Sequence, residues 1–229
     1  MISAPSENIC KYCDKAFRKE SSLAVHVCEP KRRAQQEHDP AVKLGFQAYL
    51  QFYAMTQGST KLKTYSDFAA SSYYSAFVKF GYHVRSINAI APSKFVDWVI
   101  KQNKKLDHWC HDKVYAEYLT SHLQCEAAQD ALIRTVQQAQ TWAEENSSSF
   151  DHMFRLGNKN KLCYYITQGR VTAWAIYNCD SGVDFLNGLS EEQTSIVFPW
   201  IDPTYWKKRF QDFPAEVLWC RDTLTVAGF

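Results

Sequence analysis

The sequence is poor in glycine and has little net charge, and each shortage excludes a class of protein. Its 229 residues include 8 glycines, about half the usual share of ~7%. All-β folds need many tight turns, so this scarcity disfavours them. The formal net charge of +2 excludes a polybasic nucleic-acid coat and an acidic chaperone tail, because any strongly charged surface must then be local.

Long apolar runs are also missing. A membrane span needs ~18 or more consecutive apolar residues, and the sequence has no such run. The opening residues, Met1 to Asn8, lack a basic segment followed by an apolar one, so we expect no secretory signal. We predict a cytoplasmic protein with reduced thiols, because five of its eight cysteines stand singly in helical-looking sequence: Cys110, Cys125, Cys163, Cys179 and Cys220.

Aromatic residues are abundant, and their spacing predicts helices. They make up 15% of the chain, enough large side chains to fill several helix–helix interfaces. Asp39-Pro40 has the composition of a helix start. One helical face then follows at intervals of four, three and four residues: Val42, Phe46, Tyr49 and Tyr53. Similar patterns continue to the end of the chain, and only Tyr164 to Ile166 suits a strand equally well.

The most specific pattern joins cysteines and a histidine near the start of the chain. Counted from Cys10, gaps of two, three, five and two residues lead to Cys13, Phe17, Leu23 and His26. This spacing resembles the C2H2 zinc-finger family through its first three ligands and both of its core residues. The resemblance implies a small ββα finger in which bound zinc supplies most of the folding free energy.

The fourth ligand departs from the family's pattern. The family places a His or Cys three to five residues after the first His, whereas Cys28 follows His26 by two positions. Residues at i and i+2 face apart on a helix, so this pair can share a metal only if the helix ends at about His26 and the chain turns back. Pro30 favours that turn. Cys28 is the leading fourth ligand; the alternatives are His38 and an incomplete or metal-free site.

These patterns predict the domain organisation. Residues 1–30 form the zinc finger, 31–38 a basic connector and 39–145 a helical domain. Four polar residues from Asn146 to Ser149 make the clearest linker, so 146–150 separates this domain from a C-terminal helical region at 151–229. The predicted fold class is an all-α helical body with a small N-terminal ββα zinc finger.

Basic residues around the finger indicate weak contact with nucleic acid. Seven Lys or Arg residues and three acids lie between Cys10 and Arg33, which favours salt-sensitive phosphate binding. The positions that enter the major groove in DNA-binding fingers carry no Arg or Asn here, and one finger reads only about three base pairs. Sequence-specific recognition is therefore not expected. The candidate nucleic-acid-binding residues are Lys19, Ser22, Lys31, Arg32 and Arg33.

Other suggestive groups have simpler explanations. A basic and aromatic segment from 61 to 85 is compatible with stacking on single-stranded nucleic acid, but its helical spacing favours the core. This segment contains Tyr73, Tyr74, Phe77, Phe80 and Tyr82. His108, Cys110 and His111 lack the matched second pair expected of a zinc site. No glycine-rich phosphate loop, nucleophile elbow, HExxH or paired-carboxylate motif is present, so we expect no enzyme, and a hidden hydrolase or nuclease is the alternative to that expectation.

The chain as a whole resembles zinc-finger proteins of large tailed bacteriophages. The segments that carry this resemblance are Cys28 to Arg33, Lys104 to Trp109 and Trp200 to Pro203. It implies the host-cell cytoplasm and a part in phage replication, transcription or genome handling.

Together these patterns lead to two hypotheses. The first is a non-enzymatic adaptor that binds zinc, engages DNA or RNA weakly and docks on a protein of the replication or transcription machinery. The alternative is a protein-binding or virion-associated structural protein in which zinc only stabilises the N-terminus.

Overall fold

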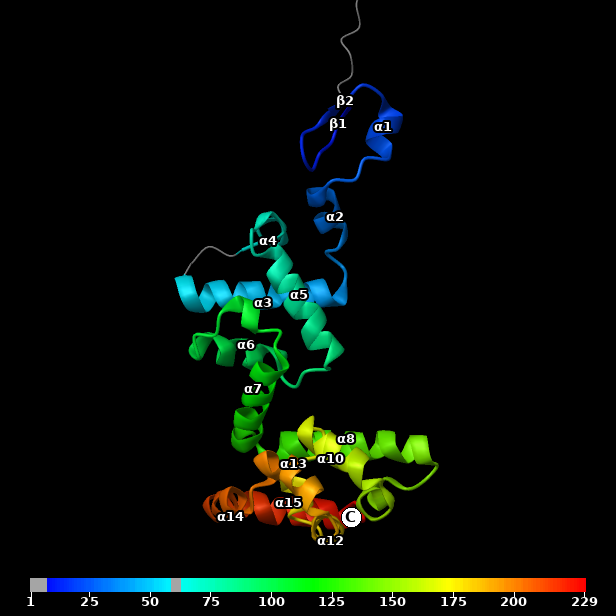
Figure 1. The fold of residues 1–229 in the computed structure, drawn as a ribbon, viewed down its shortest axis with the longest axis vertical. Helices are drawn as coiled ribbons and strands as arrows, with labels where there is room; N and C mark the ends of the chain where they lie inside the picture. Colours follow the sequence, from blue (N-terminus) through cyan, green and yellow to red (C-terminus); the bar gives the residue numbers. More distant parts are fainter. Residues whose placement is uncertain (1–7, 59–62) are drawn as a thin grey trace, which may run out of the picture. The chain divides into compact units, whose positions relative to one another are not determined.

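The computed structural model describes residues 8–58 and 63–229, and helices dominate both parts (Figure 1). The contacts divide the chain into two compact units, Met1–Tyr115 and Ala116–Phe229. The predicted fold class, a helical body with a small two-stranded element near the N-terminus, is confirmed. Residues 1–7, on which the expected absence of a secretory signal depends, lie outside the described part, as does Lys61. Within that part, no helix combines the length and apolar character needed to cross a bilayer.

The N-terminal module has the predicted ββα order. Strands β1 (Asn8–Ile9) and β2 (Ala16–Phe17) pair antiparallel, with Asn8 opposite Phe17. Helix α1 (Glu20–Ala24) follows. A second short helix, α2 (Glu29–Gln35), occupies most of the predicted basic connector at 31–38. The connector is therefore an ordered element of the first unit.

The rest of the first unit is helical. Its elements are α3 (Pro40–Gln57), α4 (Tyr65–Ala70), α5 (Tyr74–Ser86), α6 (Pro92–Lys101), η1 (Leu106–His108) and the start of α7 (Asp112–Cys125). The predicted start of α3 is confirmed, because the Asp39 carboxylate accepts hydrogen bonds from the backbone N–H groups of Ala41 and Val42 at 2.7 and 3.2 Å. Pro40 occupies the first turn, where a missing N–H costs nothing.

Aromatic side chains form the core of the first unit. Phe68, Phe77 and Phe95 are fully buried, and edge-to-face contacts link several rings, such as Tyr49 and Phe77 at 5.6 Å and 89°. For the aromatic segment from 61 to 85, the sequence favoured packing in the core over stacking on nucleic acid. Tyr74, Phe77 and Phe80 are buried as predicted. Tyr73 and Tyr82 are exposed by 50% and 46%, so the prediction of core packing is wrong for these two.

Helices α3 and α5 cross in direct backbone contact. A Cβ atom at Gly81 would lie 1.9 Å from the Ala41 carbonyl oxygen, and one at Gly45 would lie 2.5 Å from the Phe77 carbonyl oxygen. These distances are too short for any side chain. The two glycines therefore allow α3 and α5 to approach each other this closely.

The second unit follows α7 with a series of shorter helices. They are α8 (Ala128–Asn146), η2 (Phe150–His152), α9 (Met153–Leu156), α10 (Lys159–Thr167), α11 (Ala173–Ile176), α12 (Asp180–Asn187), α13 (Glu191–Ile201), α14 (Pro203–Asp212) and α15 (Pro214–Val226). Tyr164 to Ile166 belongs to α10 and is helical. The buried cluster of this unit is continuous from α8 to α15 and includes Leu132, Trp174 and Leu224.

The division between the units differs from the predicted linker. Residues 146–150 contain the left-handed C-cap of α8 at Ser147, and the Ser148 N–H closes the helix by donating to the Ala143 carbonyl. The inner face of α8, with Ala131 and Trp142, packs in the core of the second unit. The contacts therefore join α8 to the C-terminal helices and place the division within α7, at Tyr115–Ala116, whereas the sequence predicted it at 146–150.

A buried ion pair lies beside the start of α8. The Glu126 carboxylate is almost fully buried and accepts two hydrogen bonds from Arg134, at 2.7 and 2.9 Å. The same guanidinium donates to the Gly169 carbonyl at 2.6 Å. Because both charges have partners, the pair fixes the loop before α8 and the turn after α10 without leaving an unpaired buried charge.

The close contact of α3 and α5 predicts that Gly81→Ala destabilises the protein. The added methyl group forces the two backbones apart, and overpacking of this kind costs about 2 kcal/mol, more than the ~1 kcal/mol that alanine gains in helix propensity. Urea unfolding measures the change. Gly188→Ala is the matched control, because its only close neighbour is the end of the flexible Lys159 side chain, and the Asp184 carbonyl oxygen lies at an ordinary contact distance of 3.5 Å. Equal losses in the two variants would contradict this account of the crossing.

Candidate metal centre

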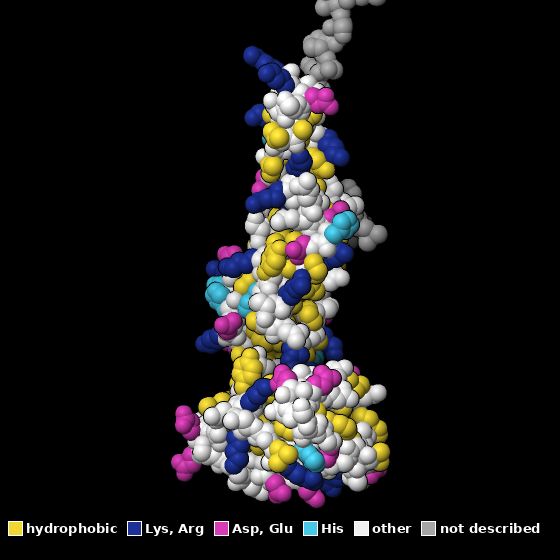
Figure 2. Space-filling view, turned by 90° about the vertical axis from the view of Figure 1, so that its right-hand side faces the viewer, with side chains coloured by type: hydrophobic (Ala, Val, Ile, Leu, Met, Phe, Trp, Pro, Cys, Tyr) yellow, Lys and Arg dark blue, Asp and Glu magenta, His cyan; other side chains and the backbone are white. Residues whose placement is uncertain are grey.

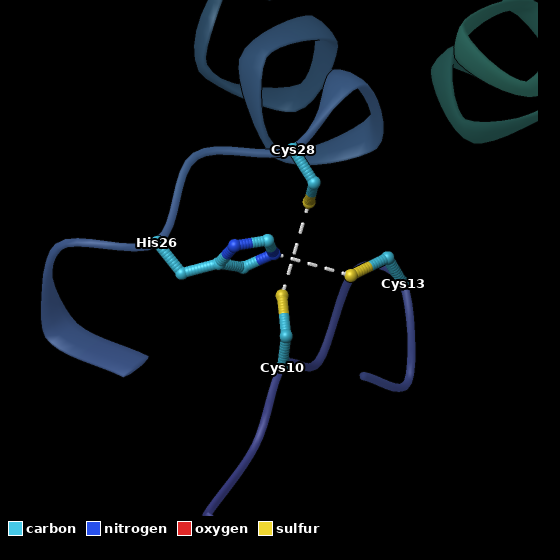
Figure 3. A group of neighbouring side chains, drawn as sticks. All are labelled: Cys10, Cys13, His26 and Cys28. Atoms are coloured by element: carbon cyan, nitrogen blue, oxygen red, sulfur yellow. Dashed lines mark hydrogen bonds between the residues drawn. The ribbon is translucent and has the colours of Figure 1, made fainter. Parts of the chain in front are cut away.

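Four side chains of the N-terminal module converge on one point (Figure 3). They are the thiols of Cys10, Cys13 and Cys28 and the imidazole of His26, and their ligand atoms all lie within 4.8 Å of one another. The sulfurs of Cys10 and Cys28 are 3.9 Å apart. The sulfur of Cys13 is 3.3 Å from Nε2 of His26. These four residues are therefore close enough to bind a metal ion.

The spacing of the ligand atoms fits a tetrahedral ion. With metal–sulfur bonds of about 2.3 Å and a metal–nitrogen bond of about 2.0 Å, neighbouring ligand atoms are roughly 3.5–3.8 Å apart. The distances of 3.9 and 3.3 Å lie on either side of this range. All three cysteines are free thiols, so no disulfide competes for the sulfurs. Only small side-chain movements separate this arrangement from a coordinated one.

The turn between β1 and β2 positions the first two ligands. The Cys10 N–H donates to the Lys15 carbonyl at 2.9 Å, and the Cys10 carbonyl accepts from the N–H groups of Cys13 and Asp14 at 3.3 and 2.8 Å. Asp14 has φ of 54°, the left-handed conformation that reverses the chain into β2. Aspartate tolerates this conformation better than most residues. Both sulfurs therefore come from one hydrogen-bonded turn.

The other two ligands lie on either side of a reversal of the chain. Helix α1 ends at Ala24, so His26 lies just beyond it, whereas the sequence placed His26 on the helix. A tight turn explains the difference, because the His26 N–H donates to the Leu23 carbonyl at 3.1 Å. Cys28 has extended backbone and is the N-cap of α2. The predicted turn after the helix is confirmed, and it allows residues two apart to face one point.

The module has almost no hydrophobic core. Among residues 8–40, Cys10 is the only buried one, and Phe17 and Leu23 are half-buried. The Phe17 ring packs on the His26 ring with their centres 4.7 Å apart. So little apolar burial gives a module of this size little stability of its own, and an ion bound by the four converging side chains would add to it.

The surroundings of Cys10 and Cys13 shift the pKa values of these two thiols in opposite directions. A backbone hydrogen bond from Tyr12 holds the pKa of the Cys10 thiol below its ordinary value, against the effect of burial. A backbone hydrogen bond from Lys15 also lowers the pKa of Cys13, but burial and the adjacent sulfurs of Cys28 and Cys10 raise it more, so its net pKa is raised. Sulfurs this close ionise together only when a cation shares the site.

The other predicted ligands do not join this cluster. His38 lies in the turn between α2 and α3 and is not part of the converging group. In residues 8–58 and 63–229, no second set of three or more ligand side chains comes together. His108 and His111 stack on each other with ring centres 5.0 Å apart. The cluster has three cysteines and one histidine, so its ligand set differs from the C2H2 set.

Some of the predicted nucleic-acid-binding residues are exposed, and others make contacts within the protein. Lys19, the N-cap of α1, and Ser22 are exposed, and Lys and Arg side chains project from the module in Figure 2. The Arg32 side chain is 61% exposed and pairs with Glu29 at 2.6 Å. Lys31 donates to the His26 carbonyl at 2.9 Å, so it supports the reversal of the chain at the metal centre.

Arg33 has an internal role that the sequence did not reveal. Its guanidinium donates to the carbonyls of Ala69 and Ser71, at 2.8 and 3.3 Å, and lies 4.6 Å from the centre of the Tyr74 ring. The Arg33 carbonyl accepts a 2.6 Å hydrogen bond from the Tyr65 hydroxyl. Arg33 therefore attaches α2 to α4 and the start of α5. In a run of three basic residues, nothing local distinguishes it from its neighbours.

The geometry predicts that Cys28, and not His38, completes the site. We expect the wild-type chain to bind one Co²⁺ with the absorption of a tetrahedral thiolate complex. Cys28→Ser should weaken binding about tenfold or more, because a residue that bonds directly to the metal matters at least as much as the groups that support it. His38→Ala should bind as the wild type does.

Cys125→Ser is the control for loss of a thiol, because Cys125 is exposed and far along the sequence in α7. A titration in which His38→Ala weakens binding and Cys28→Ser does not would assign the fourth ligand to His38.

Comparison of the chain with protein-family models, with curated proteins and with solved structures found no match. The resemblance to phage zinc-finger proteins gains no support from these comparisons.

Proposed function

We propose that this protein is a non-enzymatic zinc-binding adaptor whose N-terminal module holds nucleic acid through phosphate contacts. The observation that carries the proposal is the convergence of four ligand side chains within a small module that also holds a local excess of basic residues. The helical body would then serve to dock a protein partner.

The ligand set favours zinc over other divalent ions. Three thiolates and one imidazole in a tetrahedral arrangement are typical of structural zinc sites, whereas magnesium and calcium prefer oxygen ligands. Catalytic zinc keeps one position open for water or substrate. Here four protein side chains can fill the coordination sphere. This arrangement supports a structural ion and a non-enzymatic role.

The charge of the chain is concentrated around this centre. Residues 10–33 contain seven basic and three acidic side chains, a balance of +4, whereas the whole chain has a net charge of +2. A zinc ion with three thiolates removes one unit, which leaves about +3. Lys11, Lys15, Arg18, Lys19 and Arg32 are exposed. A surface of this kind favours phosphate contacts of modest strength that weaken as salt rises.

The shape of the module argues against reading a base sequence in duplex DNA. Helix α1 has five residues, so it is only about 7.5 Å long. Recognition helices place several consecutive turns in the major groove and use Arg or Asn for bidentate base contacts. Lys19 and Ser22 can reach phosphates but lack that capacity. Because these contacts are to phosphates and not to bases, the proposed ligand is either DNA or RNA.

Support for a protein partner comes from apolar side chains on the second unit. Ile196 and Phe198 on α13 and Leu218 and Trp219 on α15 are exposed, and each offers apolar surface that a bound protein could cover. From the resemblance to phage proteins, we propose that this partner belongs to the replication or transcription machinery in a host-cell cytoplasm.

The alternative function is a protein-binding or virion-associated structural protein in which zinc only stabilises the N-terminus. One observation favours it. Val25 and Val27, on either side of the ligand His26, are exposed by 79% and 71%. Apolar side chains this exposed suit a protein surface better than a phosphate backbone.

Loss of two exposed charges tests the nucleic-acid proposal. We expect Lys19→Gln with Arg32→Gln to weaken binding of a labelled oligonucleotide about tenfold at low salt. The slope of log affinity against log salt should fall by about one to two, because two phosphate contacts are lost. Fluorescence anisotropy in a salt series measures both quantities.

Lys207→Gln with Lys208→Gln is the matched control, because it removes the same charge from exposed positions of the second unit. If both double variants bind as the wild type does, or the wild type shows no binding at low salt, the alternative function is favoured.

A further inference from the structure

A groove lies beside the metal centre in the first unit. Its volume is about 960 Å³. The metal-binding turn lines it with Lys11 and Tyr12, and α4 lines it with Tyr65 and Ala69. Helix α2 and the residues after it, which include Glu37, supply the rest of the lining. Because residues from three elements line the groove, no single stretch of sequence indicates it.

We propose that this groove binds unpaired nucleotides, so that the protein prefers single-stranded to double-stranded nucleic acid. A base would stack on the Tyr12 ring while the Lys11 ammonium group holds the neighbouring phosphate. This inference rests on the proposed nucleic-acid function and specifies the substrate for the same module.

The size of the groove favours a single strand. Its volume is near the upper end of the range of about 300–1,000 Å³ for pockets that enclose small organic ligands. Such a space suits a few nucleotides. It is too small to enclose a DNA duplex, because the major groove of a duplex is by itself about 12 Å wide. Duplex DNA can touch only the rim, where contacts are limited to the exposed basic side chains.

Tyr12 is placed to act as a stacking platform. Its ring is half-buried, and the Lys11 ammonium lies 5.0 Å from the ring centre. Its backbone hydrogen-bonds the sulfur of Cys10, so the metal centre fixes its position. Base stacking on an aromatic ring tolerates any base sequence. A site of this kind suits a module that lacks base-reading side chains.

The charges of the groove suit a phosphate group beside Lys11. The Glu29 carboxylate pairs with Arg32 and Arg33, at 2.6 and 2.9 Å. Its negative charge is therefore offset by these two arginines within α2. Lys11 remains as the exposed cation of the lining, and Glu37 is the acid that opposes phosphate.

Helix α2 connects the parts of the lining to one another. Arg33 attaches α2 to the carbonyls of Ala69 and Ser71, and Tyr65 donates to the Arg33 carbonyl. At the other end of α2, the N-cap Cys28 is a ligand of the metal centre. The groove is therefore formed before any ligand arrives, which lowers the entropic cost of binding.

The experiment compares labelled oligothymidylate of about twelve nucleotides with a duplex of the same length. At low salt we expect the zinc-loaded wild type to bind the single strand several-fold more tightly. Tyr12→Ala should lose about tenfold in single-strand affinity and little in duplex affinity, whereas Tyr12→Phe should retain both. Glu37→Gln should bind the single strand more tightly, because it removes the opposing charge. Tyr73→Ala is the control for an exposed tyrosine outside the groove.

The outcomes separate this inference from the proposed function. If Tyr12→Ala and Glu37→Gln bind the single strand as the wild type does, while the Lys19 and Arg32 double variant loses binding, the groove is not the site and the proposed function stands. Equal affinity for duplex and single strand also overturns the groove. If the wild type binds neither probe, both proposals fail. Co²⁺ absorption of Tyr12→Ala checks that the metal centre is intact; if it is not, Lys11→Gln replaces it, with weaker single-strand binding expected.

Discussion

The meeting of three sulfurs and one imidazole nitrogen is the constraint on which the N-terminal module depends. Cys10 is the only buried residue between 8 and 40, so apolar burial contributes little there. Backbone hydrogen bonds in the turn at Cys10 to Cys13 and the reversal between His26 and Cys28 aim the four groups at one point. An ion held by these groups would take the place of the missing core, because it would link segments that are otherwise joined only by short local contacts.

Helix α2 carries that constraint into the rest of the first unit. Its N-cap is the ligand Cys28, and near its last turn Arg33 bonds to carbonyls at the end of α4. Beyond α2, Gly45 and Gly81 allow α3 and α5 to cross closely. The groove beside the metal centre therefore lies between the converging ligand residues and the packed helices of the first unit.

The helical part relies on other forces. In the first unit, aromatic rings pack edge to face around Phe77, and in the second unit a continuous apolar cluster surrounds Trp174. The buried pair of Glu126 and Arg134 adds a polar contact whose two charges satisfy each other. None of these contacts needs an ion, so removal of the metal is expected to affect the finger and α2 far more than the helical core.

The sequence by itself determined the features that arise from neighbouring residues. The spacing of Cys10, Cys13 and His26, the reversal that brings in Cys28 and the helix start at Asp39 all follow from local geometry, capping and side-chain chemistry. The tertiary structure decided what depends on distant partners. It turned Arg33 inward, joined α8 to the C-terminal helices and formed the groove, because these outcomes follow from packing between segments far apart in the chain, which local spacing does not encode.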